Sequence, residues 1–349
     1  MEGFGPRPEV TVRTASLTGA RFLPRPWREK YVHWRRTRTL AAVVESTDLV
    51  VIGCDNGPLL TDAVRIATEL GKPLCCIVHA DLEGKFALPR YRGWWSKGQT
   101  LALLRRVDKI VGVSLGLRDD LARDLPERAN DILAIPNGVD LARLDRMSAA
   151  SDPTDRLPSD RPFFLGLGRL AHQKGFDILL RAHALALRQG APEHAVVLVG
   201  EGHLRGELEQ LADQLGIGDT VVFHGFAENP FPVMARATAL CLPSRYEGYS
   251  FAVAEAAALG VPVIAFDCPH GPAEILENGR YGELLPPEDA EGLAAAMLAH
   301  LTDALPLREK AAASFQARDR LSAERRYGAY AALFDALLRR RGRIIRSAG

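Results

Sequence analysis

The second half of the chain alternates between short, uninterrupted apolar runs and longer stretches whose apolar residues recur at helical spacing. The apolar runs are Pro162–Gly168, Ala195–Gly200, Thr220–His224, Ala239–Pro243 and Val261–Phe266. The helical stretches between them are Phe176–Gln189, Leu204–Leu215, Phe231–Ala237 and Tyr249–Leu259. Unbroken apolar strands that alternate with helices are typical of a parallel sheet covered on both faces. The pattern predicts one doubly wound α/β domain over residues 162–325.

The first half repeats this alternation more loosely. Its expected strands are Val10–Ser16, Asp48–Gly53, Leu74–His79, Lys109–Ser114 and Ile132–Ile135, and its expected helices include Trp27–Glu45 and Pro58–Leu70. We therefore predict a second Rossmann-like domain over residues 1–147, and a polar, proline-rich linker over 148–161. Residues 326–349 are expected to form a helix with a basic tail that returns to the first domain. Two such domains facing each other leave a cleft at the carboxyl ends of their strands.

The composition is that of an ordinary globular protein, with 47% hydrophobic and 25% charged residues in 349. Even the apolar stretch Leu40–Ile52 is interrupted by Glu45, Thr47 and Asp48, so no run reaches the ~18 apolar residues of a membrane span. We expect a cytoplasmic location. The five cysteines form no CxxC pair, which predicts reduced, buried thiols rather than disulfides or a zinc site.

The net charge of +1 hides an asymmetry along the chain. Residues 1–150 hold 23 Lys and Arg against 18 Asp and Glu, whereas residues 151–338 hold 16 against 25. The tail beyond residue 338 adds five arginines and no acidic residue. This distribution indicates an anionic neighbour for the first half and the tail.

A glycine-rich segment with two cations follows the first strand of the second domain. It reads Gly166-Leu-Gly-Arg-Leu-Ala-His-Gln-Lys174-Gly and contains Gly168 and Arg169. Helix N-termini and flanking cations favour phosphate groups. The spacing is not that of a Walker loop, and solvated surface charges remain an alternative.

A pair of glutamates marks the next candidate site. Glu247 precedes Gly248 at the start of a helix, and Glu255 lies inside that helix among Ala, Val and Leu. Such a helix is expected to be buried, and a buried carboxylate needs a hydrogen bond or an ion pair. The vicinal hydroxyls of a ribose or hexose suit two carboxylates. Alternatives are a charge meeting the helix dipole for Glu247, and a structural ion pair for Glu255.

Two further motifs complete the set: Cys268-Pro-His270-Gly271-Pro-Ala-Glu-Ile-Leu after the next strand, and Pro136-Asn-Gly-Val-Asp140 at the end of the first domain. In this order and spacing, from about residue 40 onward, the motifs resemble the family 4 glycosyltransferases, which have the GT-B fold. Glu247 and Glu255 match the E-x7-E motif of that family, and Arg169 and Lys174 match its basic pair.

The resemblance implies transfer of a sugar from a nucleotide-sugar to a hydroxyl, with retention at the anomeric carbon. Arg169 and Lys174 would neutralise the leaving diphosphate. Glu247 would hold the donor sugar and Glu255 the ribose. The remaining residues expected to bind the donor are Gly168, Gly248, Tyr249, Ser250, His270 and Gly271. No metal and no cofactor are expected, because two cations and a helix end supply the positive charge.

His79 ends the expected strand Leu74–His79 and matches the family's histidine that reaches across the cleft to the donor sugar. A strand-end histidine with a structural role is the alternative. We therefore include His79 with Arg169, Lys174 and Glu247 among the expected catalytic residues, but not as a general base.

The chain departs from the family at its beginning, where a strand, a Gly-Gly loop and a helix are usual. Here Val10–Ser16 corresponds to the family's second strand, and Gly3 and Gly5 follow no strand. Either the first domain lacks its first strand and helix, which would leave a gap in the sheet, or the true start of the protein lies upstream of Met1. The missing loop normally contacts donor and acceptor, so its loss bears directly on activity.

Basic aromatic segments are candidates for the acceptor side. Trp27, Tyr31 and Trp34 recur at helical spacing among arginines, and Lys85–Arg106 mixes four aromatic residues with six cations. Contact with an anionic membrane surface, together with the arginine-rich tail, is one interpretation. A packed core with a solvated basic face is the other. No nucleic-acid-binding module is recognisable.

We expect a GT-B enzyme of glycosyltransferase type (EC 2.4), peripheral on the cytoplasmic face of a membrane. It would transfer a hexose or N-acetylhexosamine from UDP to a lipid-linked or surface glycan. A UDP-sugar epimerase on the same fold is one alternative, disfavoured by the E-x7-E match. A catalytically inactive scaffold that binds nucleotide or glycan is the other.

Overall fold

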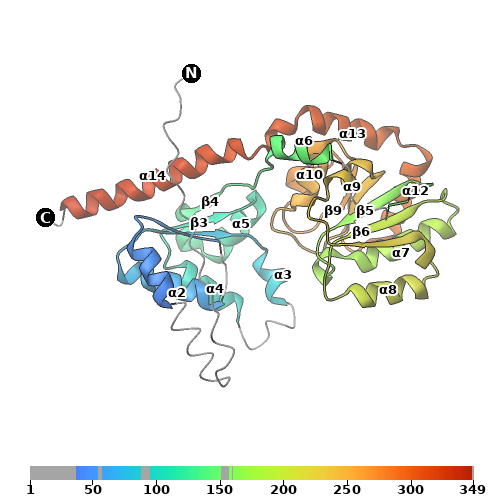
Figure 1. Cartoon of the computed structure of the whole chain (residues 1–349). Coiled ribbons are helices and arrows are strands. Elements are labelled where there is room, and N and C mark those ends of the chain that lie inside the picture. The colour runs from blue at the N-terminus through green and yellow to red at the C-terminus, as the bar shows by residue number, and fades with distance from the viewer. Residues whose placement is uncertain (1–36, 54–56, 88–94, 151–156, 159, 348–349) are drawn as a thin grey trace.

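The computed structural model describes residues 37–53, 57–87, 95–150, 157–158 and 160–347, with side chains to Arg339. Two parallel sheets form two lobes that lie side by side (Figure 1). We call residues 37–140 the N-terminal half and residues 141–323 the C-terminal half. The predicted strand Val10–Ser16, the aromatic residues Trp27, Tyr31 and Trp34, and Cys54 lie outside the described residues.

The sheet of the N-terminal half has four parallel strands in the order β1-β2-β3-β4. These are β1 (Val50–Ile52), β2 (Leu74–Val78), β3 (Lys109–Gly112) and β4 (Ile132–Ala134). Its helices are α2 (Gly57–Glu69), α3 (Leu82–Ala87), α4 (Lys97–Leu104) and α5 (Leu115–Asp124), with a short 3-10 helix at Pro126–Asp131. Each strand pairs with the next one in the chain, so the sheet has no gap between β1 and β4.

The sheet of the C-terminal half has six parallel strands in the order β10-β9-β8-β5-β6-β7. They are β5 (Phe163–Leu167), β6 (Ala195–Val199), β7 (Val221–Gly225), β8 (Ala239–Leu242), β9 (Val263–Phe266) and β10 (Glu283–Leu285). The order reverses between β5 and β8, which makes the end of these two strands the topological switch point of a doubly wound sheet. The strands β5 to β9 agree with their predicted ranges to within two residues.

Helices cover both faces of this second sheet. They are α7 (Phe176–Arg188), α8 (Arg205–Gln214), α9 (Phe231–Arg236), α10 (Phe251–Leu259), α11 (Pro272–Ile275), α12 (Ala290–Thr302) and α13 (Leu305–Gln316). Short 3-10 helices lie at His172–Lys174, Gly218–Thr220 and Arg318–Leu321. Strands β6, β8 and β9 are buried at every residue, because Val, Leu, Ile, Ala and Phe leave no polar face to expose.

Two segments connect the halves and pair with each other. Val139 donates from its backbone N–H to Leu321 and accepts from Ala323, at 2.8 and 2.9 Å. A Cβ on Gly138 would lie 2.5 Å from the Ala323 Cα, so the Pro136–Asp140 motif admits only glycine at this crossing. Helix α6 (Leu141–Ser148), which the predicted boundary assigns to the first domain, packs against α9 and α10.

The last helix, α14 (Glu324–Ser347), returns from the C-terminal half across the N-terminal sheet (Figure 1). Leu333 and Leu337 are buried there against Cys75, Val111 and Ile135. No helix within the described residues is both long and apolar enough to span a membrane.

The described cysteines are Cys75, Cys76, Cys241 and Cys268, and all four are buried and free of disulfides. Burial raises the pKa of the Cys75 and Cys268 thiols to about 12, so they stay protonated. For these four residues the predicted reduced, buried state is confirmed.

Candidate donor site at the ends of two parallel strands

The turn after β5 contains glycines that let backbone segments approach one another closely at the switch point. Gly168 (φ 148°) and Gly175 (φ 64°) both have positive φ. A Cβ on Gly175 would lie 2.0 Å from the Pro243 carbonyl oxygen after β8, and one on Gly200 would lie 1.9 Å from the Gly168 carbonyl oxygen. These approaches exclude any larger residue and bring the ends of β5, β6 and β8 together.

The turn also delivers a lysine to the end of β8. Lys174 Nζ lies 2.6 Å from Glu247 Oε1, and Ser244 Oγ donates to the same oxygen at 2.7 Å. The two charged side chains are only 17% and 6% exposed. Removing one partner of such a pair leaves a buried charge without compensation, so each holds the other in place. The predicted residues Lys174 and Glu247 thus occupy one site.

Arg169 has a different environment, although it stands in the same turn. Its side chain is exposed, and it makes no hydrogen bond or ion pair with the residues that the structure describes. The structure therefore presents one cation fixed against a carboxylate and one cation directed to solvent. Arg169 is available to an anion that enters the switch point.

The loop between Glu247 and α10 carries a buried hydroxyl that has no partner. Ser250 precedes the first residue of α10, adopts a left-handed backbone (φ 71°) and is 5% exposed. Its Oγ makes no hydrogen bond with any described residue. A buried polar atom without a partner is rare in a folded protein and needs a reason. Here it lies at the N-terminus of a helix, where anions bind.

Backbone contacts hold this loop between the two halves. A Cβ on Gly248 would lie 1.9 Å from the His79 carbonyl oxygen, and one on Gly271 would lie 2.2 Å from the Tyr249 carbonyl oxygen. Tyr249 is buried, and this raises the pKa of its phenol to about 12. Gly248, Tyr249, Ser250 and Gly271 thus form one layer, in contact with the backbone of His79.

Glu255 lies one turn into α10 and is half-buried. Burial raises its pKa to about 7, and the positive charge of Arg143 offsets only part of that rise. Within the described residues the carboxylate has no hydrogen bond and no ion pair within 4 Å. The structural ion pair considered as the alternative for Glu255 is therefore absent within the described residues.

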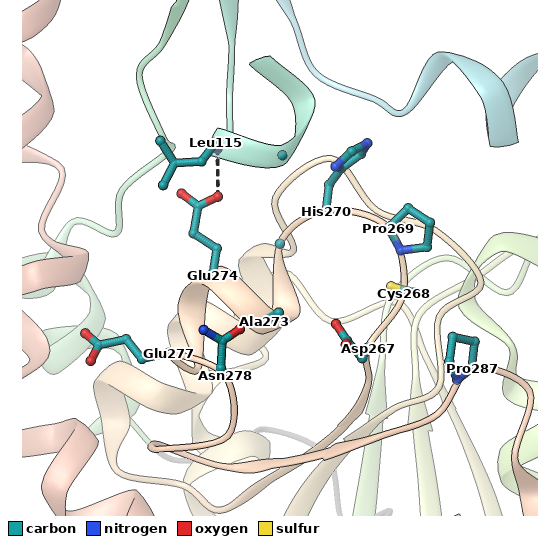
Figure 2. Close-up of a pocket in the computed structure, with 12 residues that line it drawn as sticks. Leu115, Asp267, Cys268, Pro269, His270, Ala273, Glu274, Glu277, Asn278 and Pro287 are labelled. Atoms are coloured by element: carbon teal, nitrogen blue, oxygen red, sulfur yellow. Dashed lines mark hydrogen bonds between the residues drawn. The ribbon is translucent and has the colours of Figure 1, made fainter. Parts of the chain in front are cut away.

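His79 and His270 lie where the two halves meet. His79 follows β2 with an exposed side chain, and its Nε2 would lie 3.1 Å from a Cβ at Gly53. His270, in the loop after β9, turns its ring toward the N-terminal half. A pocket of about 760 Å³ opens beside it, lined by Leu115, Gly116, Asp267–Gly271 and Glu274 among others (Figure 2).

Some contacts of this region carry no signal in the sequence pattern. Arg245 holds the β8 loop to α7 through a bidentate pair with Asp177, at 2.9 and 2.8 Å. Gln173 donates to the Tyr246 carbonyl oxygen at 3.0 Å. The neighbouring motifs indicate this region of the chain, but not which residues pair. The paired residues are 68 and 73 positions apart and are brought together only by the fold.

The segments predicted for the acceptor side are described in part. Phe86 packs against the core, and Trp95 Nε1 donates to Thr100 Oγ1 at 2.8 Å. The packed-core interpretation concerns Trp27, Tyr31 and Trp34, which lie outside the described residues, so it stays a prediction. The arginines beyond Arg339 lie outside the described side chains.

Solved structures share this two-sheet arrangement. Anabaena HepE, crystallised with UDP-glucose, superposes with a TM-score of 0.73 over 86% of this chain and 82% of its own, at 20% identity. The pneumococcal O-GlcNAc transferase GtfA, crystallised with UDP and GlcNAc, has a TM-score of 0.65 over 86% and 60% of the two chains. The fold is GT-B: two Rossmann-like domains with the switch point of the second facing the first.

Two family models match the sequence in succession. The model of Glycosyltransferase Family 4 matches residues 3–143, and the model of Glycosyl transferases group 1 matches residues 149–318. The chain therefore belongs to the family 4 glycosyltransferases, as its motifs predict.

Curated relatives include enzymes of polysaccharide synthesis. The glycogen synthase of Mycobacterium tuberculosis is 28% identical over 75% of this chain and 62% of its own length. The lipopolysaccharide core glycosyltransferase LpsE of Rhizobium meliloti is 27% identical over 76% of each. The chain spans only 36% of an uncharacterized Methanocaldococcus jannaschii glycosyltransferase and 24% of a Streptomyces coelicolor exopolysaccharide phosphotransferase.

Proposed function

We propose that this protein transfers a sugar from a UDP-sugar to a hydroxyl of a lipid-linked or surface glycan, with retention at the anomeric carbon. One observation carries the proposal. Lys174 is paired with Glu247 after β8, and Glu247 begins the loop that carries the orphan Ser250 hydroxyl and leads into α10, the helix of the unpaired Glu255. Arg169 is exposed in the turn after β5. Together these groups supply donors for phosphate and an acceptor for sugar hydroxyls.

The diphosphate would lie between Lys174, Arg169 and the N-terminus of α10. The Ser250 hydroxyl and the first amides of α10 would donate to its oxygens, and the two cations would neutralise its charge. This stabilisation matters most as the leaving group gains negative charge in the transition state. A cation pair and a helix end suffice for that task, so we propose that no metal acts on the diphosphate.

The two glutamates would hold the sugars. Glu247 is oriented by Lys174 and Ser244, and its second oxygen can accept from a hydroxyl of the transferred sugar. Glu255 gains in the ribose hydroxyls the hydrogen-bond partners that the described residues do not give it. Gly168, Gly248 and Gly271 would shape the loops around the ligand, because a Cβ at each would meet a neighbouring protein atom.

In the transfer, the bond between the anomeric carbon and the UDP oxygen breaks, and a bond to the acceptor oxygen forms on the same face. The proton of the acceptor hydroxyl passes to the leaving phosphate. His79 would contact the donor sugar from the N-terminal half without acting as a general base.

The choice of UDP as the donor nucleotide, and of a hexose or N-acetylhexosamine as the sugar, is supported by two structures of similar fold. HepE was crystallised with UDP-glucose, and GtfA with UDP and GlcNAc. The acceptor class is supported by LpsE, a lipopolysaccharide core enzyme. The basic first half and tail fit an anionic membrane surface on the cytoplasmic side, where a lipid-linked acceptor would be presented.

The test is product formation followed by proton NMR of the anomeric centre. The full chain is incubated with UDP-glucose or UDP-GlcNAc and an anionic lipid-linked glycan. We expect an α-linked product from an α-linked donor, which is lost in Lys174→Ala and kept in Lys310→Ala, a matched variant whose ion pair with Glu283 is remote from the site. A β-linked product, or epimerised UDP-sugar without transfer, would contradict the proposal.

A further inference from the structure

A carboxylate of the C-terminal half caps a helix of the N-terminal half. Glu274, in the short helix α11, accepts a hydrogen bond from the Leu115 backbone N–H at 2.7 Å, as the dashed line in Figure 2 shows. Leu115 is the first residue of α5, whose N-cap is Ser114. A negative charge at a helix N-terminus is favourable. The contact joins residues 159 positions apart.

His270 crosses the same boundary four residues earlier. Its side chain is 6% exposed, and Nε2 lies 3.1 Å from Asp120 Oδ2 and 4.0 Å from Asp81 Oδ1, both in the N-terminal half. Nε2 makes no hydrogen bond with any described residue, so these approaches are ion pairs when His270 is protonated. Gly116 leaves room for the ring, because a Cβ there would lie 2.7 Å from His270 Nδ1. His270 itself has a positive φ of 64°. The loop accepts a strained backbone in order to place this ring.

These contacts lie beside the point where the two halves touch around His79. Asp81, two residues after His79, caps α3 by accepting from the N–H groups of Glu83 and Gly84 at 3.0 and 2.8 Å. Gly84 in turn lies against the Tyr246 ring, and Gly248 lies against the His79 carbonyl oxygen. A change at His270 or Glu274 therefore reaches His79 through Asp81, α3 and α5.

We propose that His270 and Glu274 are positioning residues that clasp the C-terminal half to the N-terminal half and so hold His79 over the switch-point site. This proposal rests on the proposed function and gives His270 a role other than the direct donor contact expected from its motif. The clasp is made of polar contacts that water can replace when the halves part. These contacts therefore hold the two halves together but still allow them to separate.

The first arm of the test separates positioning from folding and from donor binding. Glu274 and His270 face the N-terminal half and are not among the groups proposed to hold UDP, so Glu274→Ala and His270→Ala should leave the UDP dissociation constant within about twofold. The kcat for transfer should fall at least tenfold in each, since small misplacements of reacting groups cost up to ~100-fold. Glu274→Gln, which keeps an acceptor for Leu115, should recover part of kcat. Glu283→Gln is the matched control and should match the wild type.

The second arm does not depend on turnover. Small-angle scattering of the full chain should show a larger radius of gyration for the His270→Ala/Glu274→Ala double variant than for the wild type and for Glu283→Gln. If no donor is turned over by the wild type, the proposed function fails, but this opening still reports on the clasp. Unchanged kcat and unchanged radius in the double variant would overturn the clasp.

The third arm asks whether the contacts are direct. Asp81, Asp120 and His270 present ligand atoms within 4.8 Å of one another, the one such group found among the described residues. Mass spectrometry of the native protein, with and without EDTA, should show no stoichiometric metal and no effect of EDTA on the radius. A bound divalent ion whose removal opens the wild type would overturn the direct clasp in favour of a metal bridge.

Discussion

Two polar clusters lie inside the C-terminal half, and they differ in how completely their groups are paired. One is the switch-point site around Lys174, Glu247, Ser250 and Glu255. The other is a chain of histidines beneath α7, in which His183 Nδ1 lies 3.0 Å from His194 Nε2. His183 Nε2 lies 2.8 Å from Thr220 Oγ1, and His194 Nδ1 lies 2.7 Å from the Pro192 carbonyl oxygen.

The histidine chain has one consistent proton arrangement. His194 must donate from Nδ1 to the Pro192 carbonyl oxygen, so its Nε2 accepts from His183 Nδ1. With both rings neutral, His183 Nε2 accepts the single hydrogen of the Thr220 hydroxyl, which then cannot also be donated to the Ile217 carbonyl oxygen 3.0 Å away. Every ring nitrogen is used, both rings are neutral, and burial together with the neighbouring His194 lowers the pKa of His183 to about 3.

Burial of polar groups does not by itself mark a ligand-binding site. The histidine chain is closed and satisfies itself, so its role is in stability. The switch-point site leaves Ser250 Oγ and Glu255 without partners in the described protein, and burial raises the pKa of Glu255. Unsatisfied groups at the ends of β5 and β8 are what a ligand would complete.

The largest expected effect is the loss of folding stability in acid, when the histidine pair of His183 and His194 becomes protonated. The folded-state pKa of His183, about 3, lies below the ordinary value of 6.5, so the unfolded chain takes up the proton first as pH falls. The free energy of unfolding should therefore decrease from pH 6.5 downward, by about 4–5 kcal/mol in total if pH 3 is reached. Urea unfolding at a series of pH values measures this slope.

His183→Leu is the matched variant for that slope. In this variant the slope of the free energy of unfolding against pH should be smaller by the equivalent of about one proton, whatever the stability at neutral pH. The contributions of His194 and His300 to that slope should remain. An identical slope in the variant and the wild type would show that His183 does not stay neutral in the fold.

The next largest effect is expected when Lys174 is removed from its ion pair with Glu247. Lys174→Ala should lower kcat/KM about 10²–10³-fold, the usual cost of removing a group that stabilises transition-state charge. Steady-state kinetics with saturating acceptor measures it, and Lys310→Ala should remain within twofold of the wild type. A loss of less than threefold in Lys174→Ala would remove the lysine from the site.

Glu255→Gln should change stability and binding in opposite directions. Because burial raises the Glu255 pKa from 4.5 to about 7, the folded state keeps a proton that the unfolded state has lost. Stability of the wild type thus falls as pH rises from 4.5 to 7. At pH 8 the variant should be more stable by up to about 3 kcal/mol, yet bind UDP at least tenfold more weakly.

Thermal unfolding and calorimetry at pH 6 and pH 8 test both halves of that prediction. A variant that gains no stability at pH 8 relative to pH 6 would contradict the raised pKa. Unchanged UDP affinity would remove Glu255 from the ribose site.

The smallest effect concerns the orphan hydroxyl. Ser250→Ala removes a group that has no partner in the free protein, so the melting temperature without ligand should hardly change. The UDP dissociation constant should rise three- to tenfold, the value of about one hydrogen bond. A stability loss without an affinity change would place the Ser250 hydroxyl in the protein's own hydrogen-bond network.

Much of this fold could be predicted from the pattern of apolar runs. Strands such as β6 (Ala195–Val199) are short, wholly apolar and bounded by turn residues, so pattern and structure agree. β10 (Glu283–Leu285) was not predicted, because three residues with a leading glutamate at a sheet edge resemble a loop. The apolar pattern likewise does not predict the helices α12 and α13, although Asp289 and Pro306 mark their starts.

The site could be predicted only as a set of residue types. The motifs placed Lys174, Glu247 and Glu255 near one edge of the sheet, because carboxyl ends of parallel strands meet there. They did not reveal which groups bond to each other, or that Glu274 reaches Leu115 across 159 positions. Such pairings depend on how the two halves pack, which no local pattern contains.

If the unpaired groups of the C-terminal half form a nucleotide site, UDP must stabilise the folded protein. We would measure the melting temperature with UDP, GDP and ADP, for the wild type, Glu255→Ala and His183→Leu. A nucleotide at ~100 times its dissociation constant should add about 2.7 kcal/mol to the free energy of unfolding. We expect UDP to raise the melting temperature of the wild type and of His183→Leu but not of Glu255→Ala. A folded wild type that responds to none of the three nucleotides would contradict the donor site.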